Sequence, residues 1–324
     1  MNTMKWLLRR EFWEHKGAMF WAPVIAASLM VLFIGGGFLF GASQIPGQVT
    51  HNGKEIAVGA AAFNSLDAAK KQEIVSVISN LYMAPSVPLY VMLAFIAFFY
   101  CLGALHDERR DRSILFWKSL PVSDAETVLS KVITACMITP LIVIAASVVM
   151  SLLLLLVGGL FLAFHGVNMF GPVLSSADFY LTPLRMVGML PVYVLWALPT
   201  VGWLLMVSAW AKSKVFLWAV GTPILAVVIV KWVDFLFGLR VDINWIVENV
   251  ILRGLVGLVP GNWFAQTKLQ PHQVMDNGSH TAAMGNVFTE SWMTLATPAV
   301  WIGAVAGVAM IFAAIRLRRW KDEG

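Results

Sequence analysis

Six long apolar segments constrain this chain more than any other feature of its sequence. They run over residues 19–42, 85–105, 132–163, 185–210, 215–238 and 298–315. A helix rises about 1.5 Å per residue, so about 20 apolar residues cross the ~30 Å hydrocarbon core of a bilayer. Hydrophobic residues make up 59% of the chain and charged residues 13%, against roughly 45–50% and 25% in soluble domains. The sequence therefore predicts an all-α, polytopic membrane protein with six transmembrane helices in a single domain over residues 1–324.

The distribution of basic residues predicts how these helices are oriented. Cytoplasmic loops of membrane proteins are enriched in Lys and Arg. With the N-terminus inside, most of the 23 Lys and Arg residues fall in the inner segments 1–18, 106–131, 211–214 and 316–324. We therefore expect both termini to be cytoplasmic, with 43–84 and 239–297 outside the cytoplasmic membrane. Topology alone accounts for the net charge of +5, so no nucleic-acid partner is predicted.

The first apolar segment is preceded by a leader with the pattern of an interfacial helix. Leu7 and other apolar residues recur near helical spacing, Trp6 and Trp13 lie at the flanks, and Arg9 and Arg10 lie on the other side. Such a helix lies along the inner interface with its aromatic rings at headgroup depth. An ordinary positive leader is the alternative. The apolar run that follows exceeds the 7–15 residues typical of a signal peptide, which favours a retained anchor.

Both outer segments also contain helical patterns. An amphipathic helix is predicted over 65–82, capped near Asn64 or Ser65. The stretch 243–264 is too apolar for a free loop but too often interrupted to span a membrane, so it predicts re-entrant or surface-lying helices before the last span. Two pairs of small residues, Gly37 with Gly41 and Gly303 with Gly307, have the spacing that permits close helix packing.

No motif for enzymatic chemistry is present in the sequence. It contains no G-x-x-x-x-G-K-[ST] phosphate loop and no G-x-S-x-G elbow, and its six histidines form no ligand pair. We therefore predict no catalytic residue, no metal site and no cofactor bound by this chain. Lys231 falls near the outer end of its span, where snorkelling is favoured over a role in ion coupling. Without an ionisable residue deep in a span, the energy for any transport is expected from outside the chain.

The segment 106–131, HDERRDRSILFWKSLPVSDAETVLSK, is predicted to form two short helices on the cytoplasmic side. Pro121 ends the first helix, and Ser123 with Glu126 has the spacing of a capping box that starts the second. Phe116 and Trp117 give the first helix aromatic side chains. Two interpretations stay open from this pattern alone. The helix is either an anchor that fills a groove of a partner protein or an interfacial helix that rests on lipid.

This segment resembles the cytoplasmic loop of ATP-binding cassette (ABC) transporter permeases of the type-2 exporter family. In that family a charged run precedes a short apolar helix, then Leu-Pro-[Val/Ile]-Ser, then a Lys at the mouth of the third span. The matching elements here are 107–112, ILFWKSL, 120–123 and Lys131. The leader resembles the family's elbow helix, and 243–264 resembles its outer re-entrant helices. The sequence departs from the common pattern because Arg112 and Ser113 replace a glycine after the charged run.

The resemblance implies a transport permease that is not itself an enzyme. ATP and Mg²⁺ would be bound by a separate ABC ATPase subunit, and the permease would act as a homodimer, or as a heterodimer with a related permease, among membrane lipids. The first, second and fifth spans would line the path of a hydrophobic or amphipathic substrate such as a lipid, peptide or drug. The rival hypothesis is a membrane scaffold or membrane-embedded enzyme with no ATPase partner. The expected ATPase-coupling residues are Asp107, Glu108, Arg112, Phe116, Trp117, Leu120, Pro121 and Lys131, and the expected elbow residues are Trp6, Arg9, Arg10 and Trp13.

Overall fold

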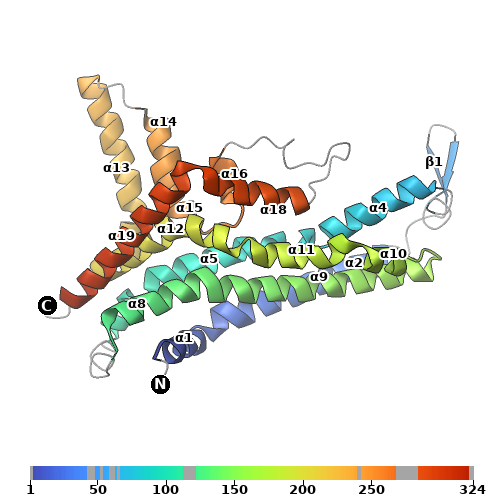
Figure 1. Cartoon of the computed structure of the whole chain (residues 1–324), viewed down its shortest axis with the longest axis horizontal. Helices are drawn as coiled ribbons and strands as arrows, with labels where there is room; N and C mark the ends of the chain where they lie inside the picture. Colours follow the sequence, from blue (N-terminus) through green and yellow to red (C-terminus); the bar gives the residue numbers. More distant parts are fainter. Residues whose placement is uncertain are drawn as a thin grey trace.

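The computed structural model is an elongated bundle of long helices (Figure 1). It describes residues 3–41, 48–51, 54–57, 63, 66–111, 122–238, 242–267 and 284–320. The α-helices and strands are α1 Thr3–Glu14, α2 Ala22–Gly41, β1 Gln48–His51, β2 Lys54–Ala57, α4 Ala68–Leu81, α5 Val87–Gly103, α6 His106–Arg110, α8 Asp124–Ile133, α9 Thr139–Phe164, α10 Phe170–Ser175, α11 Ala177–Gly188, α12 Leu190–Trp210, α13 Val215–Phe237, α14 Ile243–Ile246, α15 Arg253–Val256, α16 Asn262–Gln266, α18 Met284–Met293 and α19 Pro298–Trp320. Short 3₁₀ or π turns lie at Gly17–Trp21, Ala84–Ser86, Thr134–Ile138, Val247–Leu252 and Thr294–Ala296.

Within the described residues, six helical stretches are long and apolar enough to cross a membrane. This number and these places agree with the sequence prediction. Large apolar side chains such as Phe33, Ile302 and Val305 are at least 70% exposed on the outside of the bundle, as lipid contact requires. The six stretches are Gly17–Phe38, Ala68–Arg110, Asp124–Phe164, Ala177–Trp210, Val215–Phe237 and Pro298–Trp320.

Helix α12 forms the centre of the bundle and packs closely along α19. Gly202 of α12 and Gly307 of α19 lie so close together that a Cβ at either position would collide with backbone of the other helix. Because glycine has no Cβ, the two backbones can approach closely, which confirms a role in helix packing for Gly307. Gly37 differs, since a Cβ there would meet nothing within 4 Å. The spacing of Gly37 and Gly41 is therefore not used for close packing at Gly37 within the described residues.

Two local features differ from the sequence prediction. The all-α class is confirmed, and the one departure from it among the described residues is a short antiparallel hairpin of β1 and β2, in which Gln48 pairs with Ala57. Asn52-Gly53, which stands between the strands in the sequence, is a strong hairpin signal that the helical interpretation overlooked. Helix α4 begins at Ala68 with Asp67 at its N-cap position, later than the predicted cap. The predicted cap residues Asn64 and Ser65 lie outside the described residues.

Helices α12 and α13 form the tight hairpin that the four-residue connection 211–214 predicts. Lys214 adopts a left-handed conformation with φ of 50°, which reverses the chain just before α13. Near the turn, Trp203 Nε1 donates a hydrogen bond to the Ala219 carbonyl at 2.9 Å, and the rings of Trp210 and Trp218 meet edge to face. Farther from the turn α13 diverges from the bundle (Figure 1). The two helices therefore form a fork that opens away from 211–214.

Both described ends of the chain reach the same part of the bundle. Figure 1 shows α1, the start of α8 and the C-terminal end of α19 on one side, whereas β1 and α10 lie at the opposite end. Ion pairs between α1, α6, α8 and α19 fix this arrangement. The predicted inner segments therefore lie next to one another.

Candidate functional site

The structure describes the residues on either side of the centre of the predicted coupling segment. Its centre, with Arg112, Phe116, Trp117, Leu120 and Pro121, lies outside the described residues. On the C-terminal flank the predicted capping box is present, because the Glu126 amide donates to Ser123 Oγ at 3.1 Å and the Ser123 amide donates to Glu126 Oε2 at 3.0 Å. Helix α8 therefore starts at Asp124 and continues into the third span, as predicted.

A buried lysine joins the two flanks of this segment to the N-terminal helix. Lys131 Nζ on α8 lies 2.9 Å from Glu108 Oε1 on α6 and 3.0 Å from Glu11 Oε1 on α1. Lys131 is 1% exposed and Glu11 is fully buried. Charges removed from water this completely are tolerated only when partners neutralise them. The three side chains therefore form one electrostatic unit, which we call the inner ion network.

Two arginines extend the inner ion network to both ends of the chain. Arg10 Nη2 on α1 lies 2.7 Å from Glu108 Oε1, and Arg318 Nη1 on α19 lies 2.7 Å from Glu108 Oε2. Arg318 Nε also lies 3.0 Å from Asp124 Oδ1 at the first position of α8. Glu108 is consequently shared by three cations from three helices. Four helices thus meet at one carboxylate beside the predicted coupling segment.

The charge balance around Arg10 favours its protonated form. Burial acts to lower the pKa of the guanidinium, but the hydrogen bond to Glu14 and the negative charges of Glu11 and Glu108 outweigh it. The pKa of Arg10 is therefore raised above its ordinary value. The Arg10 side chain faces the inner ion network, so the expectation that it lies on the basic outer side of the leader with Arg9 is wrong.

Two neutral groups connect the inner ion network to the apolar spans. Tyr100 Oη on α5 donates to Glu11 Oε2 at 2.7 Å. Ser208 Oγ on α12 accepts hydrogen bonds from the amides of Leu105 at 3.1 Å and His106 at 3.0 Å. These two amides lie where α5 ends and α6 begins, and a helix start leaves amides without partners in its own helix. The serine of the central helix therefore stabilises the change of direction that places Glu108.

The structure brings together only part of the predicted set. Glu108, Lys131 and Arg10 meet in the inner ion network, whereas Asp107 is half exposed and contacts His106 at 3.2 Å. The expected elbow residues Trp6 and Trp13 are 62% and 56% exposed, and Arg9 is exposed as well. Among the residues above, the sequence prediction did not include Glu11, Tyr100, Asp124, Ser208 and Arg318.

The sequence contains a signal for the burial of Glu11, which the prediction missed. Glu11 follows the buried Leu7 by four positions, so both lie on the face of α1 that packs into the bundle. A carboxylate on a buried face requires a cationic partner. Arg318 has no comparable signal, because it stands among Arg316 and Arg319 in a basic terminal run. Its burial is decided by the contacts of α19 and is visible only in three dimensions.

Glu11, Glu14 and His15 also lie close enough together to suggest a metal site. Lys131 and Arg10, however, already pair with the carboxylates of Glu11 and Glu14. The cluster is thus neutralised by side chains of the chain itself. It offers no argument for a metal.

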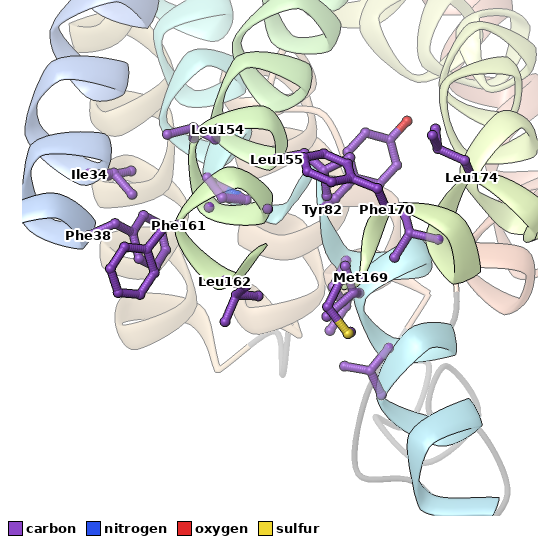
Figure 2. A pocket seen from close by; sticks show the side chains of 17 residues that line it. Ile34, Phe38, Tyr82, Leu154, Leu155, Phe161, Leu162, Met169, Phe170 and Leu174 are labelled. Atoms are coloured by element: carbon purple, nitrogen blue, oxygen red, sulfur yellow. The ribbon is translucent and has the colours of Figure 1, made fainter. Parts of the chain in front are cut away.

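An apolar cavity of about 530 Å³ lies at the opposite end of the bundle, between α2, α4, α9 and α10. Figure 2 shows Phe38, Tyr82, Leu155 and Phe170 around it. The Tyr82 hydroxyl is occupied by a hydrogen bond to the Phe179 carbonyl at 3.1 Å, so it adds little polarity. Cavities of a few hundred Å³ with apolar walls suit hydrophobic molecules.

A scan against protein-family models, a search of curated proteins and a search of solved structures each found no match. The resemblance of 107–131 to a permease loop therefore stays a prediction from the sequence. A function for this chain has to be proposed from that resemblance and from the contacts within the chain.

Proposed function

We propose that this chain is the membrane-spanning permease subunit of an ATP-driven ABC exporter, with both termini in the cytoplasm. A separate ABC ATPase would bind ATP and Mg²⁺ and dock on segment 112–121. One observation carries the proposal: the inner ion network clamps both flanks of that segment to each other and to two further helices. Glu108 precedes the segment, Lys131 and Asp124 follow it, and Arg318 contacts both Glu108 and Asp124.

This clamp supports a mechanical role for the segment. A displacement of 112–121 by a docked ATPase moves α6 and α8 directly, and the ion pairs pass it to α1 and α19. Breaking a buried ion pair from one side costs about 3–5 kcal/mol. Turning a 1:99 equilibrium of two states into 99:1 takes about 5.5 kcal/mol of differential binding. Separating these ion pairs would therefore cost an energy of the same order as the coupling requires, so the four helices are expected to move together rather than apart.

The N-terminal helix supports the proposal as an elbow at the membrane surface. Trp6 and Trp13 are exposed while Leu7 and Glu11 face the bundle. Exposed tryptophans are enriched at the headgroup region of a bilayer, because the indole N–H can contact water there while the ring contacts lipid. In this role α1 holds the inner end of the bundle at the interface.

Hydrophobic or amphipathic cargo and a dimeric assembly are further parts of the proposal. The apolar walls around Phe38 and Phe170 favour a hydrophobic cargo over an ion. Helices α2 and α13 expose most of their surface, including Phe33 at 86% and Phe235 at 84%. A second copy, or a related permease, placed against these helices would enclose a path between the first, second and fifth spans.

The rival function is a membrane scaffold or membrane-embedded enzyme whose 112–121 segment rests on lipid. The inner ion network would then stabilise the fold without transmitting movement. Docking of an ATPase separates the two functions. We therefore propose purifying the tagged chain from native membranes and identifying co-purified proteins by mass spectrometry.

Trp117→Glu with Leu120→Glu removes the expected anchors, and Ser113→Glu with Ser119→Glu is the control because it adds the same charge to the same segment. The proposal predicts that an ATPase with a phosphate loop co-purifies with the wild-type chain and with the control. The ATPase should be lost from the variant that carries Trp117→Glu and Leu120→Glu. Retention of the ATPase by the variant with Trp117→Glu and Leu120→Glu would show that these two residues do not anchor the ATPase. Absence of any ATPase from the wild-type preparation would favour the scaffold or enzyme. Screening lipids, peptides and drugs for stimulation of ATP hydrolysis by the reconstituted complex would identify the cargo.

A further inference from the structure

A second buried cation lies far from the inner ion network. Arg253 begins α15, and the sequence places it in the long outer segment. The structure instead buries it, with 7% of its surface exposed, between α12 and α19. Its guanidinium carbon lies 4.6 Å from the ring centre of Trp196 on α12. Arg253 belongs to none of the six spans, yet its side chain packs against two of them.

The glycine at position 303 makes room for this guanidinium. A Cβ built on Gly303 of α19 would collide with the Nη2, Cζ and Nε atoms of Arg253. The main chain of Arg253 is fixed as well, because Thr200 Oγ1 on α12 donates to its carbonyl at 2.9 Å. The side chain is thus held in a fitted position by two spans.

The charge of Arg253 has no counterpart in the described part of the chain. Its Nε and Nη2 atoms are buried and make no hydrogen bond there. Lys131 and Arg318, the other buried cations among the described residues, each contact two carboxylates. A buried guanidinium without an anion is costly, and ionisable groups at membrane depth mark functional sites. An anion that reaches the guanidinium from outside the chain would therefore offset this cost.

A cavity of about 390 Å³ adjoins Arg253 in the fork between α12 and α13. Its walls are mainly apolar and include Trp203, Pro223 and Ile302. The few polar groups are Arg253, Asn249 and Thr222. A mostly apolar cavity with a small number of polar groups at one place is typical of a site for a small organic ligand.

We propose that this cavity, which we call the fork cavity, binds an amphiphile through its single anionic group. A phosphate or carboxylate accepts hydrogen bonds from the guanidinium of Arg253, which lines the cavity, and the apolar chain lies along Trp203 and Ile302. The planar fork of a guanidinium matches both anions in a two-point geometry. Apolar walls favour an anion that carries a hydrocarbon chain over a free inorganic ion. This inference does not depend on the ATPase partner.

The test measures binding to the purified full chain in a neutral detergent by native mass spectrometry, which resolves each adduct by mass. The probes are dodecyl phosphate, dodecanoate, dodecanol and inorganic phosphate. We expect dodecyl phosphate or dodecanoate to bind at least tenfold more tightly than dodecanol, since charge-assisted bidentate hydrogen bonds exceed neutral ones. Binding of inorganic phosphate as tightly as dodecyl phosphate would contradict a site for amphiphiles. Equal binding of dodecanol would contradict the role of the anion.

Three variants locate the site. Arg253→Met keeps the length and apolar stem of the side chain and is expected to lower affinity for the anionic probe at least tenfold. Gly254→Leu retains Arg253 but fills the fork cavity, because a Cβ at Gly254 meets nothing within 4 Å, and it is expected to lower affinity similarly. Arg185→Met, which removes an arginine paired with Asp178 at 2.9 Å, is the control and should bind as the wild type does.

Unchanged affinity in Arg253→Met would overturn the proposal. If that variant fails to fold, as judged by gel filtration, Gly254→Leu decides, and unchanged affinity there overturns the proposal in the same way. Because the chain is tested alone, loss of ATPase docking leaves these outcomes unaffected.

Discussion

Lys131 Nζ lies 2.9 Å from Glu108 Oε1, which joins the residues on either side of segment 112–121 inside the protein. A buried ion pair therefore links the described residues that precede and follow this segment. Glu11 and Arg318 extend this link to the first and last described helices. In the proposed function, a force applied to the segment would act on all four helices together.

Lys131→Met tests the stability of this link. The variant leaves the carboxylates of Glu11 and Glu108 with one cation fewer in a buried place, so we expect a loss of about 3–5 kcal/mol in the free energy of unfolding. Thermal unfolding of the purified chain measures the effect. Lys212→Met is the matched control, because Lys212 is exposed in the turn between α12 and α13. A similar loss in both variants would contradict a linking role for Lys131.

Pairing Lys131→Met with Glu11→Gln tests whether the two residues act as a unit. Removing the charge of Glu11 relieves the imbalance that Lys131→Met creates, so the double variant should lose less stability than the two single variants summed. The unfolding midpoints of the four proteins give the coupling energy. Simple addition of the two losses would indicate that the contact between Lys131 and Glu11 contributes nothing.

Ser208→Ala tests the junction between α5 and α6. The change removes the acceptor for the amides of Leu105 and His106, and leaving buried polar groups unpaired costs about 1–3 kcal/mol. Hydrogen exchange at these two amides should accelerate as well. Ser28→Ala is the control, because the exposed Ser28 hydroxyl only donates to the Val24 carbonyl of its own helix. Unaltered exchange at Leu105 and His106 in Ser208→Ala would refute this role.

Gly307→Ala tests the close contact between α12 and α19. A Cβ at this position collides with the backbone of Leu198 and Pro199, so the helices must separate, which typically costs about 1–3 kcal/mol. At Gly36 of α2 a Cβ has free space, and Gly36→Ala should be neutral or slightly stabilising because alanine favours helices. Equal unfolding temperatures for the two variants would show that α12 and α19 are not held at this distance.

The membrane architecture was predictable from the sequence because it depends on local properties. Apolar length sets the six spans, and the spacing of Ser123 and Glu126 sets the start of α8. The β hairpin had a local signal in Asn52-Gly53 that the helical interpretation passed over.

The inner ion network and the position of Arg253 were not predictable in the same way. Glu11, Glu108 and Arg318 are separated by long stretches of sequence, and no periodic pattern indicates which charge meets which. Arg253 belongs to a stretch that predicts re-entrant or surface-lying helices, and only the packing of α15 against α12 and α19 shows that its side chain is buried. Contacts between distant residues decide both sites.

Photo-cross-linking from position 117 tests the central claim most directly. A photoreactive benzoylphenylalanine replaces Trp117 in the full chain, native membranes are irradiated, and the adducts are identified by mass spectrometry. We predict an adduct with an ATPase that contains a phosphate loop, and no such adduct when the same group replaces Trp301, near the start of α19. Adducts with lipid alone at position 117 would contradict the claim that this segment couples the chain to an ATPase.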